Sequence, residues 1–448
     1  MSFMNKSAAA LVLTGVAAAV STAYAAGFQL TEQSSLGLGR AYAGAGIVGD
    51  DLSAVHYNPA GMTLLEGTRF QAGGTWIALN ADYNGKGDSE NGRLKGQMIP
   101  AGYVTHQVND KIWLGFAMTV PFGMGTEYDR TWSQSQRGTN AKIYTFDMNP
   151  NIAWKVNDFL SVGAGVSVQY AKAELGMGLK EQGMYLGHGK VEADSWDWGF
   201  NLGIMISPTD KLRFGLAYRS SIEHNADGTT KLSGMNSSLG SGTQLAALGQ
   251  ALGQLEGQTF GMSTTLETPD TVMLTGTWEA TDQLRLSGLI RWANWSNFKE
   301  LNIENDVPGS VLAGFDKLAG LGLPLDSKML TNVDVVNDWQ DTWLFSVGAD
   351  YKINSAFTIR GGIAYETSPI DDQSTRMAVI PDTDRVWLSL GASWHATKDL
   401  QFDVGATYLM GVGDTDLYSA TKEDGGTKVG KYDSLDAYLI GAQMQYRF

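Results

Sequence analysis

The C-terminal stretch DAYLIGAQMQYRF (436–448) alternates between two kinds of side chain. A β-strand points successive side chains to opposite faces, so this pattern predicts a strand with one apolar and one polar face. Counted back from the end, the apolar or small residues are Phe448, Tyr446, Met444, Ala442, Ile440 and Tyr438, and Leu439 is a departure. The same alternation runs through 112–120, 160–170 and 400–408. Runs of about ten residues have the length that a tilted strand needs to cross a bilayer.

A soluble β-sandwich also contains alternating strands, so the lengths of the connections decide between the two architectures. Short turns recur as VNDKI (108–112), VNDFL (156–160), PTDKL (208–212), ATDQL (280–284), INSAF (353–357) and ATKDL (396–400). Long polar connections lie between them at 80–96, 122–141, 178–190, 223–259, 300–340, 367–383 and 411–435. Short and long connections therefore alternate strictly, which is typical of outer-membrane barrels and has no reason to occur in a sandwich.

This rhythm divides 69–448 into fourteen predicted strands, an even number as single-chain bacterial barrels have. They cover 69–79, 97–108, 111–121, 142–156, 159–177, 192–208, 211–222, 260–279, 283–299, 341–352, 356–366, 384–396, 399–410 and 436–448. The predicted fold class is all-β transmembrane, a fourteen-stranded antiparallel barrel.

The first residues, MSFMNKSAAALVLTGVAAAVSTAYA (1–25), have the features of a cleaved secretory signal. Lys6 precedes an apolar run that is too short to span a bilayer as an anchor, and Ala23-Tyr24-Ala25 fits the cleavage rule. We therefore expect export to the outer membrane of a Gram-negative bacterium, with the mature chain beginning at Ala26. The net charge of −15 argues against nucleic-acid binding, and the absence of Cys excludes disulfides and thiolate metal sites.

Residues 26–68 precede the first strand and show no alternation long enough to join the wall. A flexible tail is one interpretation, but the segment carries too many apolar residues for a disordered chain, Phe28 and Leu30 among them. A fourteen-stranded barrel is wider than the side chains of its wall can fill. We therefore predict that 26–68 folds into the lumen as a plug.

The motifs of this segment resemble a known family. AGFQLTEQSSLGLGRAYAGAG (26–46), Asp50-Asp51 and NPAGM (58–62) are similar to the N-terminal hatch of the long-chain fatty acid transporters of the FadL type, and AVIPDTDRVWLSLGASW (378–394) and Ser368-Pro369 resemble their later strands. The resemblance implies a hatch-plugged barrel that takes up hydrophobic molecules passively. It implies capture by outer loops, a pocket beside the hatch and lateral release through a gap in the wall.

Two prolines interrupt neighbouring predicted strands. Pro100 (QMIPAGYV) and Pro121 (MTVPFGMG) cannot donate to a ladder, and the turn at Asn109-Asp110 places Pro100 opposite Thr119 or Val120. They are either independent prolines at strand ends or a local seam that matches the gap of the family. The predicted gap residues are Pro100, Gly102, Val120, Pro121, Phe122 and Gly123.

The stretch HYNPAGM (56–62) is predicted to end a short helix and leave it stiffly, because a residue before proline is pushed toward extended backbone. The resemblance implies that Asn58 on this exit offers its amide to unpaired backbone groups at the Pro100/Pro121 seam. Phe28, Leu30, Asn58, Pro59 and Ala60 are the predicted hatch and latch residues.

Two long loops carry apolar segments suited to capture of a hydrophobic molecule. TQLAALGQALGQLEG places Leu245, Leu248, Leu252 and Leu255 on one helical face, and VLAGFDKLAGLGLPL follows in the 300–340 loop. These helices either bind the substrate or cap the barrel by packing together, and both roles are compatible.

A fatty acid carboxylate would need a base in the lumen. Alternation predicts Arg213, Arg219, Arg285 and Arg291 on the inner face, and Lys299 is a further candidate. Family members can carry a basic contact after the fifth strand, where this chain reads AELGMGLK with Met177 and Lys180. That departure keeps an aromatic hydrocarbon substrate open.

Three further alternatives concern other classes of protein. His395 shares a strand face with Ser393 and Ser389, so an outer-membrane lipid hydrolase is one. Neighbours on one face of one strand are a weak signal for a Ser, His and acid arrangement, and we expect no enzyme. An adhesin and a plain diffusion pore, which would lack a plug, are the others. We expect no cofactor, no metal and a monomer. The expected partners are a hydrophobic small molecule, outer-membrane lipid with lipopolysaccharide, and the barrel-assembly machinery, for which the terminal Phe448 resembles the signal.

Overall fold

The computed structural model describes residues 27–85, 88–91, 96–181, 184–237, 246–319, 328–418 and 426–448. The predicted signal at 1–25 therefore lies outside the described residues. In the part of the chain that is described, no helix is both long and apolar enough to span a membrane.

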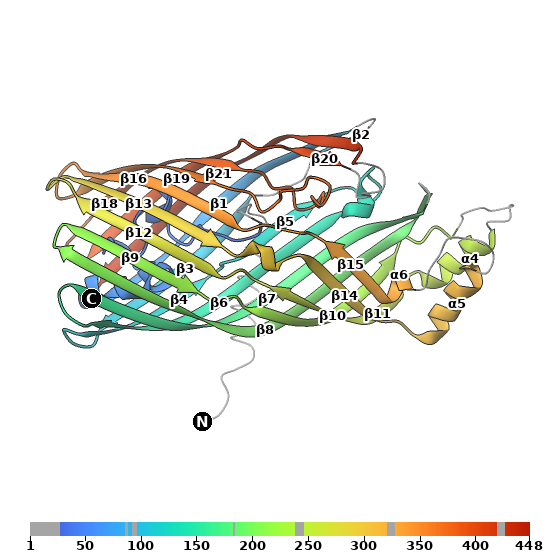
Figure 1. The fold of residues 1–448 in the computed structure, drawn as a ribbon, viewed down its shortest axis with the longest axis horizontal. Helices are drawn as coiled ribbons and strands as arrows, with labels where there is room; N and C mark the ends of the chain where they lie inside the picture. The colour runs from blue at the N-terminus through green and yellow to red at the C-terminus, as the bar shows by residue number, and fades with distance from the viewer. Residues whose placement is uncertain are drawn as a thin grey trace, which may run out of the picture.

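Fourteen of the described strands follow one another around a closed antiparallel ring (Figure 1). The first and last strands pair along their length, from Arg69 opposite Arg447 to Gly85 opposite Gly430, which closes the barrel. The predicted fourteen-stranded barrel is thereby confirmed. The ring strands are β1 (Thr68–Gly85), β3 (Gln97–Gln107), β4 (Ile112–Thr119), β6 (Asn140–Lys155), β7 (Leu160–Glu181), β8 (Met184–Thr209), β9 (Leu212–Arg219), β12 (Thr271–Glu279), β13 (Leu284–Ala293), β16 (Thr342–Lys352), β17 (Phe357–Glu366), β18 (Arg385–His395), β19 (Leu400–Gly411) and β21 (Lys428–Arg447).

Shorter strands extend the wall beyond the ring, at the end with the long connections. They are β2 (Asp88–Asn91), β5 (Gly123–Glu127), β10 (Glu223–Ser233), β11 (Thr259–Glu267), β14 (Glu300–Asp306), β15 (Asn332–Val336) and β20 (Asp416–Tyr418). The predicted long connections 223–259 and 300–340 therefore contain strands that the sequence analysis did not predict. β8 is long enough to leave the ring and pair with β10, after which β11, β14 and β15 each pair with the strand before.

The predicted strand 260–279 is also wrong, because it is two strands with different partners. β12 pairs with β9 and β13 in the ring, whereas β11 pairs with β10 and β14 outside it. Pro269 lies between them and cannot donate to a ladder. The predicted strand 283–299 likewise ends early, since β13 stops at Ala293 and a short 3-10 helix, η3 (Trp295–Asn297), follows.

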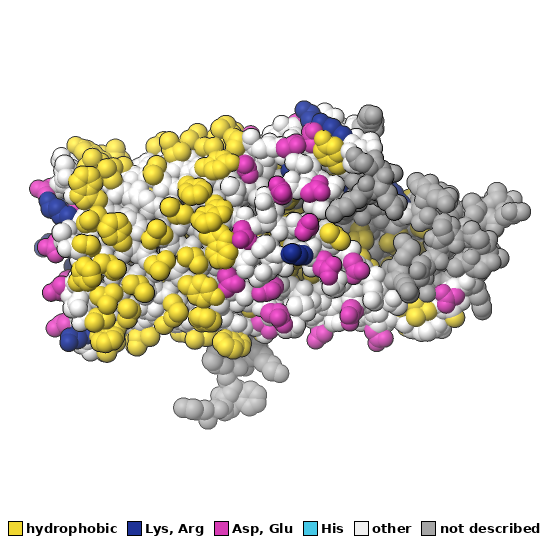
Figure 2. All heavy atoms as spheres, viewed as in Figure 1, with side chains coloured by type: hydrophobic (Ala, Val, Ile, Leu, Met, Phe, Trp, Pro, Cys, Tyr) yellow, Lys and Arg dark blue, Asp and Glu magenta, His cyan; other side chains and the backbone are white. Residues whose placement is uncertain are grey.

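The outer face of the ring is apolar where a membrane would surround it. Figure 2 shows hydrophobic side chains over the half of the barrel away from α4 (Ala246–Leu255) and α5 (Gly309–Ala319), and acidic side chains beyond them. Phe116, Leu202 and Leu390 are exposed on this face, whereas inner-face residues such as Trp113 and Trp387 are buried. The inside–outside alternation of the strands therefore follows the sequence pattern.

The N-terminal segment 27–67 lies inside the ring, at the end opposite α4 and α5 (Figure 1). It contains α2 (Ser35–Leu38), α3 (Ala54–Tyr57) and the 3-10 helix η1 (Pro59–Leu64). α2 packs against β18, β19 and β21, and η1 packs against β4, β6, β7 and β8. The remaining described helices, η2 (Ser135–Arg137) and α6 (Lys328–Thr331), belong to the long connections.

Two inner-face glycines allow η1 to sit against the wall. A Cβ at Gly203 would lie 2.2 Å from Oδ1 of Asn58, and one at Gly163 would lie 2.6 Å from the carbonyl carbon of Pro59. A side chain at Gly203 would occupy the space of the Asn58 side chain, and one at Gly163 would occupy the space of the Pro59 backbone. The wall sequence therefore contributes to seating the segment.

We expect Gly203→Ala to loosen this seat, because it displaces the buried Asn58 amide from its partners at a cost of about 1–3 kcal/mol. Hydrogen exchange of the amides in 54–62 should show a lower opening free energy by that amount. Gly189→Ala is the control on the same strand, because its Cβ would meet only Leu232 at 3.9 Å. Equal exchange in both variants would contradict this account of the seat.

Candidate functional site

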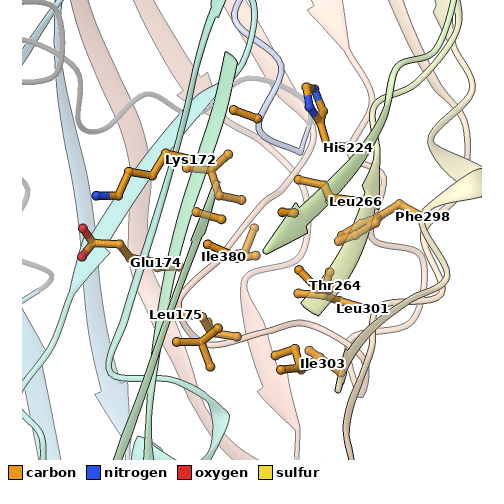
Figure 3. Close-up of a pocket in the computed structure, with 18 of the residues that line it drawn as sticks. Lys172, Glu174, Leu175, His224, Thr264, Leu266, Phe298, Leu301, Ile303 and Ile380 are labelled. Atoms are coloured by element: carbon orange, nitrogen blue, oxygen red, sulfur yellow. The ribbon is translucent and has the colours of Figure 1, made fainter. Parts of the chain in front are cut away.

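An apolar chamber of about 790 Å³ lies inside the extended wall (Figure 3). Ala171, Ala193 and Ala226 of β7, β8 and β10 contribute small side chains, which leave the space open. Larger side chains from the long connections close it, namely Leu266, Phe298, Leu301, Ile303 and Ile380. The chamber has the apolar lining of a site for a hydrophobic small molecule.

The chamber has few polar groups and no base directed into it. Figure 3 shows the charged ends of Lys172 and Glu174 turned away from the cavity. Lys172 forms an ion pair with Glu192, and Lys190 forms one with Glu174 at 2.8 Å. The polar side chains on the lining include His224, Thr264 and Asn337. A ligand in this chamber is therefore held by apolar contacts.

A second, polar chamber of about 690 Å³ lies between the N-terminal segment and the wall. Arg219, Arg291 and His56 line it, together with Gln169 and Asn201. Burial, and next the charge of Arg219, holds the pKa of His56 well below its ordinary value, so its imidazole is neutral. The two arginines are then the cationic groups on this lining.

Both arginines are held in place by polar partners. Arg219 donates to Oγ of Ser167 at 2.7 Å and to the carbonyl of His56 at 3.0 Å, and its guanidinium lies 3.4 Å from Asp147. Arg291 donates to Thr31 and to Glu366, both at 2.8 Å. Two of the five predicted head-group candidates therefore share one cavity.

The other candidates lie elsewhere. Arg285 belongs to an ion-pair cluster with Asp50 at 3.0 Å and Glu279 at 2.6 Å, on a cavity of about 680 Å³ near the short turns. Arg213 reaches the carbonyl of Val48 at 3.5 Å, and Lys299 is exposed. Lys180 donates to the carbonyls of Trp132 and Ser133 at 2.9 and 3.1 Å.

The ladder between β3 and β4 ends early, at the position of the two prolines. Its last described pair is Gly102 opposite Met118, so Pro100 pairs only with Gly74 of β1. β4 stops at Thr119, and the chain resumes as β5 at Gly123, which pairs with β6 alone. We call the facing stretches 97–101 and 119–123 the seam.

The N-terminal segment supplies partners to the seam from inside. The side-chain amide of Gln33 donates to the carbonyl of Val120 at 2.7 Å, and the N–H of Val120 donates back at 3.2 Å. Leu30 donates to the carbonyl of Pro121 at 2.7 Å, and Gly123 donates to that of Phe28 at 2.9 Å. Residues 28–33 therefore satisfy backbone groups that a neighbouring strand would otherwise satisfy.

The predicted role of Asn58 at this seam is wrong. Its amide donates to the carbonyl of Ile204 on β8 at 3.0 Å, and its oxygen accepts from the N–H of Ala60 at 3.1 Å. The extended backbone at Asn58 was predicted correctly, with φ −154° and ψ 100°, but the glycines at 163 and 203 direct the turn toward β7 and β8. Pro59 and Ala60 are buried there with it.

The other predicted segment residues lie near the seam. Leu30 packs in a buried cluster with Val120 and Ile99. The ring of Phe28 lies 6.0 Å from Phe122, 5.8 Å from Phe298 and 4.6 Å from Trp295, measured between centroids. These edge-on contacts anchor the first described residues in an aromatic cluster.

The predicted capture leucines are covered where they are described. Leu245 and the side chain of Leu248 lie outside the described residues. Leu252 and Leu255 are buried in one cluster with Leu186, Leu232, Met235, Phe260 and Val307. α4 thus packs against its neighbours at these two positions, as the capping alternative expects.

The buried carboxyl of Glu32 has no hydrogen-bond partner on either oxygen among the described residues. Burial, and next the neighbouring Glu366, raises the pKa of Glu32 from 4.5 to about 8, so it is protonated at neutral pH. Arg291 and Arg385 also face it, as do Tyr42 and Tyr57. This carboxyl sits beside Gln33, which bridges the seam.

The features of a hydrolase do not assemble. Ser393 donates to Asp403, and Ser389 shares a hydrogen bond with Thr407 at 2.7 Å, whereas His395 lines the charged cavity near the short turns. Across the described ranges, no three His, Asp or Glu side chains are arranged to hold a metal ion.

Sequence reasoning missed the apolar chamber, Gln33 and the inner alanines, and only the family resemblance implied a pocket beside the N-terminal segment. The chambers are formed by strands and loops far apart in the chain, so alternation gives no sign of them. For Gln33 a weak signal existed, since it is an uncharged amide in an apolar segment that is predicted to be buried beside a strand break.

Comparison with known proteins gives consistent matches over most of the chain. A family model described as Outer membrane protein transport protein (OMPP1/FadL/TodX) matches residues 16–448. The long-chain fatty acid transport protein of Escherichia coli (strain K12) is 30% identical over 426 residues, which cover 87% of this chain and 89% of that protein. The crystal structure of a Pseudomonas aeruginosa FadL homologue matches with a TM-score of 0.80 at 23% identity, covering 94% of this chain and all of that one. The toluene transporter TodX of P. putida matches with a TM-score of 0.69 at 15% identity, covering 94% and 99%.

Glu32 should make the seating of the N-terminal segment depend on pH. The seated form keeps its proton up to about pH 8, whereas a released carboxyl loses it near 4.5, so release is favoured as pH rises through that window. The opening equilibrium of residues 28–33 should rise by up to about tenfold per pH unit, after correction for intrinsic exchange rates. Hydrogen exchange of Glu32→Gln should lack this contribution, and an equal slope in both proteins would contradict it.

Proposed function

Because the chain belongs to the OMPP1/FadL/TodX family of outer membrane transport proteins, we propose that it takes up long-chain fatty acids or similar hydrophobic molecules and releases them laterally. Membership makes it an outer-membrane transporter of hydrophobic molecules and not an enzyme, as predicted. The proposed route runs from the apolar chamber to the polar chamber and leaves through the seam.

One observation carries the route: the polar chamber is lined by Pro121 and Phe122, which belong to the seam. The two chambers also adjoin along the wall. On β7, Gln169 lines the polar chamber and Ala171 lines the apolar chamber. Ile222, just before β10, also lines the polar chamber, and His224 on β10 lines the apolar chamber. A molecule that moves from one chamber to the next therefore approaches the place where the ladder is interrupted.

The N-terminal segment acts as the hatch in this proposal. Its burial inside the ring leaves no direct route for a large molecule along the barrel axis. Gln33, Leu30 and Phe28 bind the inner side of the seam, so a shift of this segment would uncover it. In this proposal the latch is the 28–33 stretch.

Charge suggests how a fatty acid would be oriented. Its tail fits the apolar chamber, and its carboxylate fits the polar one, where Arg219 and Arg291 offer charge-assisted hydrogen bonds. An aromatic hydrocarbon is the second candidate, because the apolar chamber has no base directed into it. The similarity to a toluene transporter accords with that alternative.

The proposed partners outside the lumen follow from the surface. Figure 2 shows an apolar belt with acidic side chains beyond it, and we propose that the belt contacts outer-membrane lipid and that the acidic surface lies at the level of the lipopolysaccharide head groups. Capture by the packed loops at Leu252 and Leu255, handling by the barrel-assembly machinery through Phe448, and a monomeric state stay predictions.

Filling the apolar chamber should stop transport. Ala226→Trp places an indole in the cavity, so uptake of labelled oleate and of toluene should fall at least about tenfold, as occlusion of a binding cavity predicts. The matched control is Asn225→Trp, because Asn225 is the preceding residue on β10 and is exposed. Normal uptake by a correctly assembled Ala226→Trp barrel would rule out the route.

A large side chain beside the seam should block release. Gly102 lies on the same outward face of β3 as the exposed Val104. A Cβ added at Gly102 would contact only the carbonyl of Gln71, at 3.8 Å. Gly102→Arg should therefore assemble and lose uptake. Gly276→Arg is the control on the paired wall between β9 and β13, where the lipid-facing charge carries a similar cost of about 2–4 kcal/mol near the midplane. Equal uptake by the two variants would exclude the seam as the exit.

A further inference from the structure

A single side-chain hydrogen bond lies at the boundary between the two chambers. Nε2 of His224, which lines the apolar chamber, is 3.0 Å from Oε1 of Gln169, which lines the polar chamber. Because an amide oxygen only accepts, the proton of this bond belongs to Nε2 of the imidazole. Both side chains are buried.

The other side of the boundary is made of packed aromatic rings. Phe122 lines the polar chamber and Phe298 lines the apolar one, and Phe28 packs edge-on against both. Displacing such rings would expose a large apolar area to water. Replacing one hydrogen bond between side chains by another has a much smaller net free-energy cost. The His224–Gln169 contact is therefore the weaker part of the boundary.

His224 also lies beside a part of the wall that has few backbone hydrogen bonds between strands. The β8–β9 ladder ends at Asn201 opposite Arg219, and the β8–β10 ladder begins at Asp194 opposite Asp227. Between them, Nδ1 of His224 contacts Oγ of Ser195 at 3.0 Å and lies 3.2 Å from Asp197. The imidazole of His224 therefore keeps its contacts to β8 when its hydrogen bond to Gln169 is broken.

We propose that the His224–Gln169 hydrogen bond is a movable partition that a transported molecule must separate to pass from the apolar chamber to the polar chamber. This inference rests on the proposed route through both chambers. A small hydrocarbon that binds among the apolar side chains of the first chamber leaves the partition closed. A long-chain carboxylate whose head group reaches Arg219 extends across the boundary and holds the partition open.

Locking the contact with a metal ion tests the partition. Gln169→His places a second imidazole beside His224, and Zn²⁺ binds such nitrogens at about 2.0–2.1 Å, which suits two atoms that now lie 3.0 Å apart. Zn²⁺ should inhibit uptake of labelled oleate by this variant at least about tenfold, and EDTA should restore it. The wild type and the double variant Gln169→His/His224→Ala, which lacks the second ligand, should be insensitive to Zn²⁺.

A second variant removes the partition without a metal. Gln169→Ala leaves the His224–Ser195 contact in place and, in correctly assembled barrels, should transport oleate faster than the wild type, although the unpaired Nε2–H of His224 lowers its thermal stability. Either zinc inhibition of Gln169→His or faster uptake by Gln169→Ala supports the partition. Unchanged uptake in both overturns it. If Ala226→Trp blocks uptake and these variants do not alter it, only the partition fails; if Ala226→Trp transports normally, the route itself fails.

Discussion

Every backbone N–H and C=O at membrane depth needs a hydrogen-bond partner, because lipid supplies none. The closed ring meets this requirement through its ladders, including the β1–β21 pairing that joins the two ends of the chain. At the seam, the ladder between β3 and β4 stops at Gly102 and Met118. There the backbone groups of Val120, Pro121 and Gly123 are bonded by Gln33, Leu30 and Phe28. The position of the N-terminal segment therefore depends on the same constraint that closes the barrel.

The interior divides polar from apolar groups along the direction of the strands. Alanines on β7, β8 and β10 leave an apolar space next to the long connections, and buried arginines line the space beside the N-terminal segment. The arginines near the segment are paired with acids, as Arg291 is with Glu366. Their charges can thus be buried without leaving the lumen open to bulk water. The apolar chamber suits the tail of an amphiphile and the polar chamber suits its head group, whereas a hydrocarbon would need only the apolar chamber.

Much of the wall was predictable because strand periodicity is a local property. The fourteen ring strands, the short turns and the break at Pro100 and Pro121 follow from alternation and from the missing donor of proline. The errors lie where pairing is decided by distant strands: β10, β11, β14 and β15 form because β8 extends past the ring and offers an edge. The role assigned to Asn58 failed for a similar reason, since the glycines that receive its turn lie on β7 and β8 and not at the seam.

The sequence by itself determined the barrel and the interruption of its wall, since each depends on residues that are neighbours along one strand or turn. Only the tertiary structure decided which residues meet at the interruption and how the lumen is divided. Gln33 and Val120 are joined, as are His224 and Gln169, across separations of 87 and 55 residues. No local pattern encodes such pairs, because they form only when ring closure brings separate strands and the buried N-terminal segment to the same height in the lumen.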